Sequence, residues 1–230
     1  RLKLLSKNQI RSVNILSMTA TPIPRTLAMS TFGDMDISII DKLPPNRQQI
    51  ETIVLNIDKI PELILSIQNK IQNNQLSKLY WVCPLVEESE ILDLSAVEKR
   101  FEYLIKYFKD SVSILHGKMK AEDKEVIMKE FSDTNSKIKI LVSTTVIEVG
   151  VDVPDATLMV IENAERFGLS SLHQLRGRIG RGKDKSTCIL LHSHALTEPA
   201  KQRLQIMKST TDGFKIAQKD LELRGAGDLL

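Results

Sequence analysis

Between residues 50 and 195, short apolar runs alternate with longer amphipathic stretches. The runs are rich in β-branched residues, so they predict buried strands. The predicted strands are Glu51–Leu55, Leu79–Val86, Val112–Leu115, Ile138–Ser143, Leu158–Glu162 and Thr187–His192. Strands that alternate with helices along a chain build parallel sheets covered on both faces. The pattern therefore predicts an α/β fold with a mostly parallel sheet and helices on both sides.

The amphipathic stretches place apolar residues on single helical faces, which predicts helices that pack on the sheet. One stripe consists of Ile60, Leu63, Ile64, Ile67 and Ile71, and a second of Val97, Phe101, Leu104, Ile105 and Phe108. Ser95 and Glu98 have the spacing of a capping box, which predicts that the second helix begins there. We interpret both stripes as core rather than as binding sites.

Residues 1–41 contain too little predicted structure for a domain of their own. Two predicted strands, Val13–Ala20 and Asp36–Asp41, flank a predicted helix at Arg25–Phe32. Two strands and one helix cannot close a core, so we interpret this part as the tail of a preceding domain.

The remaining segments complete a layout of four parts. Residues 42–49 contain two adjacent prolines among polar neighbours and predict a linker to the α/β unit at 50–197. Residues 198–230 are charged and predicted to be helical, and the Gly-Ala-Gly at 225–227 ends the helix. The residues predicted to share its packing face are Phe214, Ala217 and Leu221.

Composition narrows the possible functions. The chain has 230 residues, 42% of them hydrophobic, and a net charge of +3. So small a charge gives no strong field, and any nucleic-acid contact has to come from placed residues. Cys83 and Cys188 lack zinc-ligand spacing and indicate buried thiols in a reducing compartment. No apolar run approaches the ~20 residues of a membrane span, and no signal peptide is visible. The chain begins at Arg1 and ends at Leu230 without a polar tail, so we expect a piece of a longer protein.

The stretch Gln174–Arg181 is the richest in candidate chemistry. Arg176, Arg178 and Arg181 repel one another, and the intervening glycines weaken any helix that carries them. A dense anion would offset that cost, because the planar guanidinium binds phosphate through two hydrogen bonds. The alternative is the solvated basic end of a helix.

A second candidate site lies in Ser143–Asp152, directly after a predicted strand. In parallel sheets, ligands bind beyond the carboxyl ends of the strands, where hydroxyls and a helix N-terminus can hold a phosphate oxygen. Thr144 and Thr145 are the candidate hydroxyls, although they can equally cap a helix. Gly150 would let the backbone approach a ligand, and Asp152 can accept a ribose hydroxyl or fix an arginine.

Two further polar segments also follow predicted strands. His116 and Lys118 can contact a nucleic-acid backbone, or they belong to an ordinary turn. Thr19, Ala20 and Thr21 stand at the end of the first predicted strand. The two hydroxyls either link two faces of a cleft or simply end the strand.

Taken in chain order, these segments resemble the motifs of superfamily 2 helicases. Thr19–Thr21 match motif III, Ser143–Asp152 match motif V and Gln174–Arg181 match motif VI. Longer stretches that resemble the family formed by RecG and the transcription-repair coupling factor are residues 19–26, 80–90, 161–169 and 220–225. Trp-Val-Cys-Pro-Leu and Asn-Ala-Glu-Arg-Phe-Gly favour the RecG type, and the resemblance spans nearly the whole chain.

The resemblance implies two RecA-like domains that face each other across an ATP site. Residues 50–197 would be the second of these, and residues 1–41 a remnant of the first. Arg178 and Arg181 would act as arginine fingers on the γ-phosphate, which stabilises the charge that develops in phosphoryl transfer. The further residues implied to contact nucleotide are Gly150, Asp152 and Gln174.

The resemblance also assigns residues to DNA and to coupling. The residues implied to contact nucleic acid are His116, Lys118, Thr144 and Thr145. Those implied to couple hydrolysis to movement are Thr19, Ala20, Thr21 and Arg224, the last within a partial translocation motif (TRG) that forms a helical hairpin in this family. The expected partner of the whole enzyme is branched double-stranded DNA, as at stalled forks and Holliday junctions, and the expected place is the bacterial cytoplasm and nucleoid.

Two parts of the family's ATP site are missing from this sequence. It has no Gly-x-x-x-x-Gly-Lys-Ser/Thr loop and no Asp-Glu box for Mg²⁺. ATP and Mg²⁺ are therefore implied as cofactors of the whole enzyme, with none expected on this chain, which should not hydrolyse ATP alone. The phosphate-binding RecA-like domain and a wedge domain are the implied partners within the same protein, and no membrane or metal site is expected.

Two other functions stay open at the level of sequence. The coupling factor shares most of these motifs, and its partner is RNA polymerase. A catalytically inactive RecA-like module that only binds DNA or protein is the second. Arg178 and Arg181 favour the ATPase, because a scaffold has no need of them.

Overall fold

The computed structural model describes residues 16, 18, 36, 38–40, 48–73, 78–84, 90–144 and 152–224, with 90–94 and 224 described by their backbone. Several predicted features lie outside these residues. They include the helix at Arg25–Phe32, the coupling residues Thr19, Ala20 and Thr21, most of the linker, Thr145, Gly150 and the side chain of Arg224.

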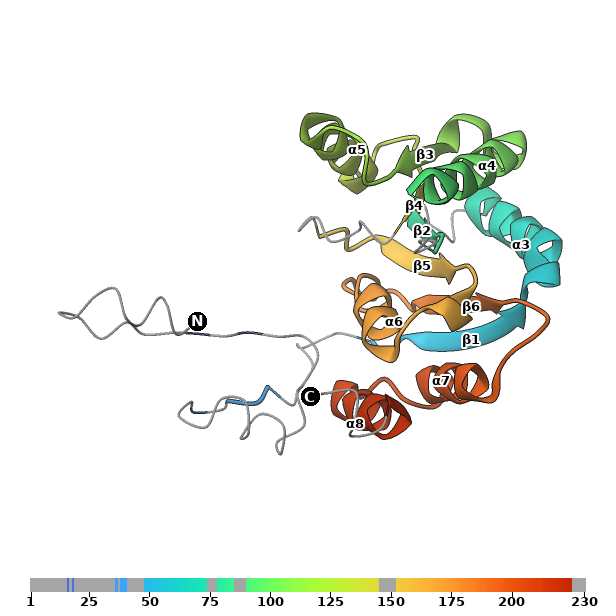
Figure 1. Ribbon diagram of the computed structural model, residues 1–230. Coiled ribbons are helices and arrows are strands. Elements are labelled where there is room, and N and C mark those ends of the chain that lie inside the picture. The colour runs from blue at the N-terminus through green and yellow to red at the C-terminus, as the bar shows by residue number, and fades with distance from the viewer. Residues whose placement is uncertain are drawn as a thin grey trace.

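Within the described part, six parallel strands form one sheet in the order β1-β6-β5-β2-β4-β3. The strands are β1 (Glu51–Asn56), β2 (Lys78–Val82), β3 (Val112–Leu115), β4 (Ile140–Ser143), β5 (Ala156–Ile161) and β6 (Thr187–His192). Figure 1 shows β1 at one edge beside α7 and β3 at the other edge beside α4 and α5. The carboxyl ends of all these strands therefore lie along the same side of the sheet.

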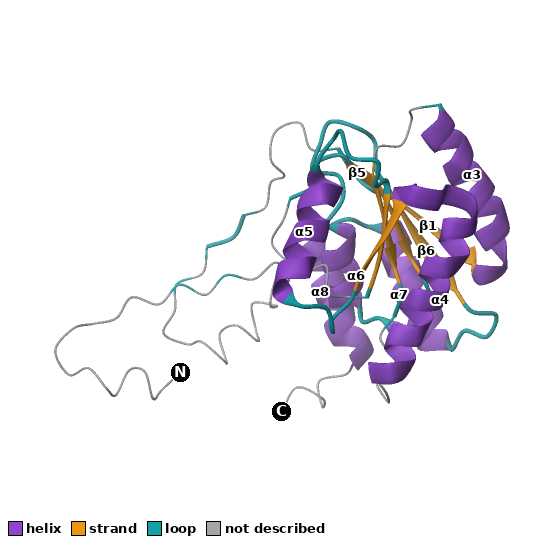
Figure 2. Cartoon of the chain, turned by 90° about the horizontal axis from the view of Figure 1, so that it is seen from above, coloured by secondary structure: helices purple, strands orange, loops and turns teal. Residues whose placement is uncertain are grey.

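Helices cover both faces of this sheet. They are α3 (Ile60–Gln72), α4 (Glu90–Phe108), α5 (Ala121–Ser132), α6 (Leu169–Arg176), α7 (Glu198–Ser209) and α8 (Gly213–Arg224), with short 3₁₀ turns η1 (Ile57–Lys59), η2 (Lys109–Ser111) and η3 (Ala164–Arg166). One apolar cluster joins the sheet to α3 and α4, and another joins it to α5, α6, α7 and α8. Figure 2 shows these layers from above. The predicted fold class is confirmed.

Most strand predictions agree with the structure to within two residues, and two match it at both ends. Val112–Leu115 and Thr187–His192 are strands with the predicted bounds. The capping-box prediction is wrong, because α4 begins at Glu90 and Ser95 lies inside it. Ile105 is also misplaced in the predicted core stripe, since it is 37% exposed. Leu104 and Phe108, its neighbours in the predicted stripe, are buried against the sheet, so Ile105 lies at the margin of the packing face.

Two predictions about the flanking segments are corrected as well. Leu16 and Met18 were expected in a buried strand, but they lie outside any strand and are 81% and 83% exposed. The described residues of Asp36–Asp41 are likewise exposed and not in a strand. A strand needs hydrogen-bonding neighbours, and the described part of the chain supplies none here. In α8, Phe214 is 43% exposed, and Ile216, at 2%, is the residue that packs on the sheet side.

Candidate functional site

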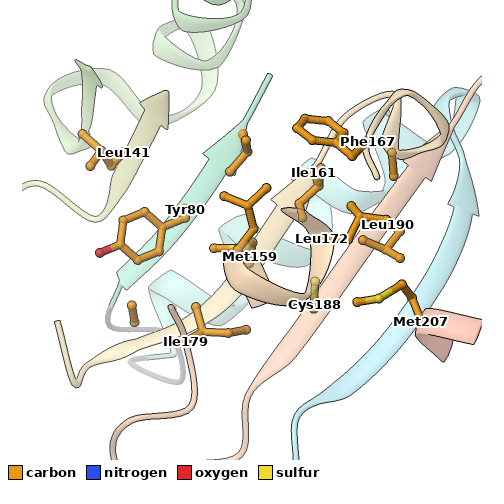
Figure 3. Close-up of a cluster of buried hydrophobic side chains, with 14 of the residues drawn as sticks. Tyr80, Leu141, Met159, Ile161, Phe167, Leu172, Ile179, Cys188, Leu190 and Met207 are labelled. Carbon is orange, nitrogen blue, oxygen red and sulfur yellow. The ribbon is translucent and has the colours of Figure 1, made fainter. Parts of the chain in front are cut away.

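The segment after α6 turns sharply, so that the three arginines of this stretch point to different places. Helix α6 ends at Arg176, and the amide of Arg178 still donates to the carbonyl of Leu175. Ile179 is fully buried in the cluster drawn in Figure 3, between the two arginines that follow the helix. Because Ile179 anchors the segment, Arg178 and Arg181 are free to lie toward the surface, where Arg178 is half-buried and Arg181 exposed.

Arg176 belongs to the interior instead. It is 2% exposed, and one guanidinium nitrogen donates to Met207 O at 2.7 Å, Thr210 O at 3.0 Å and Thr52 Oγ1 at 3.2 Å. Burial lowers the pKa of this guanidinium, although arginine stays charged even so. The arginine cluster therefore does not share one anion, since Arg176 is engaged in joining α6 to β1 and to the end of α7.

The loop around Arg181 is fixed by two close approaches. Gly180 has φ +70°, and a Cβ built there would lie 2.8 Å from Ile50 Cγ1. A Cβ on Gly182 would lie 2.8 Å from the carbonyl oxygen of Pro154. The first position needs glycine for its backbone conformation as well as for space. These contacts press the bend against the start of β1 on one side and against the loop before β5 on the other.

Arg181 consequently meets Asp152. Its guanidinium lies 3.1 Å from Asp152 Oδ1, and its Nε donates to Gly177 O at 3.3 Å. The two side chains are 33% and 58% exposed, so solvent screens the pair and it contributes little to stability. The expectation that Asp152 can fix an arginine agrees with this geometry.

Arg178 has no ion pair among the described residues. Arg178 and Arg181 both act electrostatically on the phenol of Tyr80, which belongs to the same buried cluster (Figure 3). Burial raises the pKa of Tyr80 to about 12, while the two arginines oppose that rise. Two cationic groups thus lie near Tyr80, and of the two only Arg181 has an ion-pair partner, Asp152, among the described residues. Gln174 is exposed on α6, one turn before Arg178.

A row of side chains crosses the carboxyl end of the sheet on the α4 face. Leu115 pairs with Ser143, Val82 pairs with Ser143 and Val82 pairs with Ile161. The next residue of each strand therefore falls in one register row. From β3 to β5, in sheet order, the members of this row are His116, Thr144, Cys83 and Glu162.

Two members of the row carry unpartnered polar atoms. His116 Nδ1 and Thr144 Oγ1 are both buried and have no hydrogen-bond partner within the described part of the chain. Burial lowers the pKa of His116, with a weaker opposing effect from Glu98 and further lowering by Lys124 and Lys118. This lowering favours the neutral imidazole. Unpartnered buried polar atoms are rare and call for a ligand, a water or a rearrangement.

Thr144 is less accessible than its predicted role requires. The residue is 2% exposed, so its hydroxyl does not reach the surface in this conformation. Lys118, two residues after His116, is exposed. Contact between Thr144 and a phosphate stays a prediction, and it requires an opening of this edge.

Sequence reasoning missed the fourth member of the row, Glu162. This buried carboxylate accepts a hydrogen bond from the Trp81 indole and pairs with Arg100 of α4. An acidic residue directly after an apolar strand was an available signal, as was a tryptophan whose N–H needs a partner. The partners lie too far away along the chain for spacing to reveal them.

Metal binding and membrane insertion have no structural support in the described residues. No group of three His, Cys, Asp or Glu side chains there is arranged to hold a metal ion. No helix among them is long and apolar enough to cross a membrane. Arg224 is the last residue of α8, and its side chain lies outside the described part.

Comparison with known proteins bears on this site. The family model described as "Helicase conserved C-terminal domain" matches residues 57–183. The ATP-dependent DNA helicase RecG of Acidithiobacillus ferridurans is 51% identical over 94% of this chain, which corresponds to 31% of that protein. RecG of Bacillus subtilis is 46% identical over 99% of this chain and 33% of its own length. The chain thus spans about a third of the length of the curated relatives it matches.

Solved structures give the same picture. A structure of RecG bound to a three-way DNA junction matches 92% of this chain and 27% of that chain, at 40% identity and a TM-score of 0.75. Domain 2 of the DEAD-box helicase Mss116p, bound to an RNA duplex, matches 71% of this chain and 62% of that chain, with a TM-score of 0.55. At 16% identity the second match shows the fold alone.

Proposed function

Because the chain belongs to the helicase conserved C-terminal domain family, we propose that it forms the second RecA-like domain of a RecG-type, ATP-dependent DNA helicase. In this proposal its task is to present Arg178 and Arg181 to the phosphates of a nucleotide held by another part of the protein. The observation that carries the proposal is the arrangement around Ile179. The segment is anchored in the core, and its two flanking arginines lie outside the buried network that uses Arg176.

The arginines fit a triphosphate by charge and by geometry. ATP, when bound, supplies the phosphoryl group whose transfer to water drives the enzyme. Arg178 and Arg181 would donate to its terminal phosphate and stabilise the charge that develops there. Asp152 holds Arg181 until then. Exchange is easy because an exposed ion pair is worth only about 0–1 kcal/mol. Gln174 and Asp152 would also contact the nucleotide, while Mg²⁺ would be held elsewhere in the whole protein.

The α4 end of the sheet would hold the nucleic acid. The hydroxyl of Thr144, which has no partner among the described residues, supports this role, because a phosphate oxygen would supply the missing acceptor once this edge opens. His116 and the exposed Lys118 lie on the adjacent strand end. We propose that these residues, with Thr145, grip the DNA backbone, that Gly150 lies close to the nucleotide, and that Thr19, Ala20, Thr21 and Arg224 couple the two sites. The partner of the whole protein would be branched double-stranded DNA, as in the related RecG structure.

The division of labour can be tested directly. We expect the whole protein to hydrolyse ATP with strong stimulation by a three-way DNA junction, because both halves of the ATP site are then present. We expect this 230-residue chain alone to show no turnover above background. Both are measured as phosphate release at saturating ATP and Mg²⁺. Robust turnover by the pure chain would overturn the proposal.

Thr144→Val tests the proposed DNA contact without disturbing the fold. Valine has the shape of threonine and removes a hydroxyl that has no partner in the described part of the chain, so stability should not fall. A hydrogen bond to a charged phosphate contributes about 1.5–3 kcal/mol, so DNA affinity should weaken by roughly tenfold or more. Fluorescence anisotropy with a labelled junction measures this in the whole protein. Ser143→Ala is the matched control, since Ser143 Oγ also has no partner among the described residues but, one position earlier along β4, belongs to the opposite face of the sheet. Equal affinity of Thr144→Val and the unmodified protein would remove Thr144 from the DNA site.

A further inference from the structure

Glu162 is the centre of a buried polar network that joins three elements. Its Oε1 accepts from Trp81 Nε1 of β2 and lies against Arg100 Nε of α4, while its Oε2 accepts from Arg100 at 3.0 Å. The Arg100 guanidinium lies 5.6 Å from the Trp81 ring centre and 5.2 Å from that of Tyr103. The side chains of Arg100 and Glu162 are only 18% and 8% exposed. Trp81 Nε1 and one terminal nitrogen of Arg100 thus donate to this carboxylate, while Arg100 Nε lies close to it without a hydrogen bond.

The backbone at Glu162 leads straight to the arginine segment. The amide of Glu162 donates to Val82 O at 2.9 Å, which ends the β5 ladder. Asn163 then adopts a left-handed conformation, with φ +45°, and starts η3. Phe167 follows directly and, with Leu169 and Leu172 of α6, is buried on the other face of the sheet. Glu162 therefore fixes the point at which the chain crosses from the α4 face to the face that carries Arg178 and Arg181.

Stability alone is a weak reason for such a network. Two charges lose their hydration on burial, and apolar residues of the same volume often stabilise a fold equally well. What an ion pair with directed hydrogen bonds does better is to fix one geometry. Here the geometry concerns the orientation of α4 relative to the end of β5. The same helix carries Glu98, which acts electrostatically on His116 in the row at the sheet end.

We propose that Arg100 and Glu162 are a positioning pair that sets the alignment of Arg178 and Arg181 with the nucleotide. The proposal rests on the proposed function. The pair touches neither nucleotide nor DNA, and it acts by holding α4 against the turn that leads into η3 and α6. Misplacement of a catalytic group by about 1 Å can cost up to about 100-fold in rate. Loss of the pair should therefore reduce turnover while leaving the binding of both ligands intact.

Glu162→Gln is the first test, because it keeps an acceptor for Trp81 and removes the charge that holds Arg100. In the whole protein we expect junction-stimulated kcat to fall roughly tenfold, with KM for ATP and Kd for DNA within about twofold of the unmodified values. Glu102→Gln is the matched control, since it removes an exposed carboxylate from α4, the helix that carries Arg100. It should change neither kcat, KM nor Kd. An unchanged kcat in Glu162→Gln overturns the positioning role.

A second variant separates positioning from folding. Trp81→Phe, Arg100→Met and Glu162→Leu together replace the polar network by apolar groups of similar volume. We expect this triple variant to keep the urea midpoint of the unmodified protein and still to lose most of its junction-stimulated kcat. Wild-type kcat in the triple variant overturns the proposal. So does a loss of kcat that merely follows a loss of folded protein in both variants.

Arg181→Ala, assayed alongside, separates a failure of the positioning role from a failure of the proposed function. If it is inactive while Glu162→Gln has normal kcat, only the positioning role fails. If Arg181→Ala itself retains full activity, the proposed function fails first. A low kcat in both variants, with ligand binding retained, supports both inferences.

Discussion

Arg181→Ala should reduce the DNA-stimulated ATPase rate of the whole protein by on the order of 10³-fold or more, the range known for arginine fingers. The physical reason is that the guanidinium stabilises charge which appears only in the transition state, so its removal acts on kcat. Stability should be almost unchanged, because the substitution removes only an exposed ion pair with Asp152 and a long hydrogen bond to Gly177. DNA affinity should also stay within about twofold.

Phosphate release at saturating ATP and junction DNA measures the fall in rate, and anisotropy measures DNA binding. Lys183→Ala is a suitable control, since it removes an exposed positive charge two residues further along the chain. A near-normal rate in Arg181→Ala would show that the finger has been assigned to the wrong residue. A parallel loss in the control would point instead to a general effect of charge.

Arg176→Ala, in contrast to Arg181→Ala, should act on stability, and it should cost about 3–5 kcal/mol in the free energy of unfolding. The substitution leaves two buried oxygen acceptors and a partly buried one without their shared donor, and it creates a cavity between α6 and β1. Activity would then be lost because folded protein is lost. Urea unfolding followed by circular dichroism measures the effect.

Lys201→Ala provides the comparison, because it removes a cation from α7 that makes only an exposed contact with Glu198. Its effect on the free energy of unfolding should stay below about 0.5 kcal/mol. If Arg176→Ala lost less than about 1 kcal/mol, the buried hydrogen bonds of Arg176 would not be what joins α6 to α7. The structural role of Arg176 and the catalytic role of Arg181, five positions further along the same motif, would then have to be reassigned.

The fold could be predicted from the sequence because the apolar pattern that marks each strand and helix is local. A run such as Thr187–His192 lies between two covering layers, so every position is apolar or nearly so, and its ends are marked by polar residues. The failures have local causes too. Ser95 has the right spacing for a cap, but helix formation continues through it from Glu90. Phe214 is apolar yet exposed, because α8 packs through Ile216 instead.

The candidate site was accessible only in part. Spacing brings Arg176, Arg178 and Arg181 together, but it does not say which one turns inward. That depends on the carbonyls of Met207 and Thr210, which lie more than thirty residues further along the chain. Glu162 depends on partners that are 81 and 62 residues away. Tertiary contacts at such separations leave no periodic trace in the sequence.

The close packing of Gly180 against Ile50 has a mechanical consequence. Ile50 directly precedes β1, so the chain enters the sheet at the place where its side chain fills the space above Gly180. The start of β1 and the bend between Arg178 and Arg181 therefore share one close contact, and a displacement of Ile50 is expected to displace the bend as well.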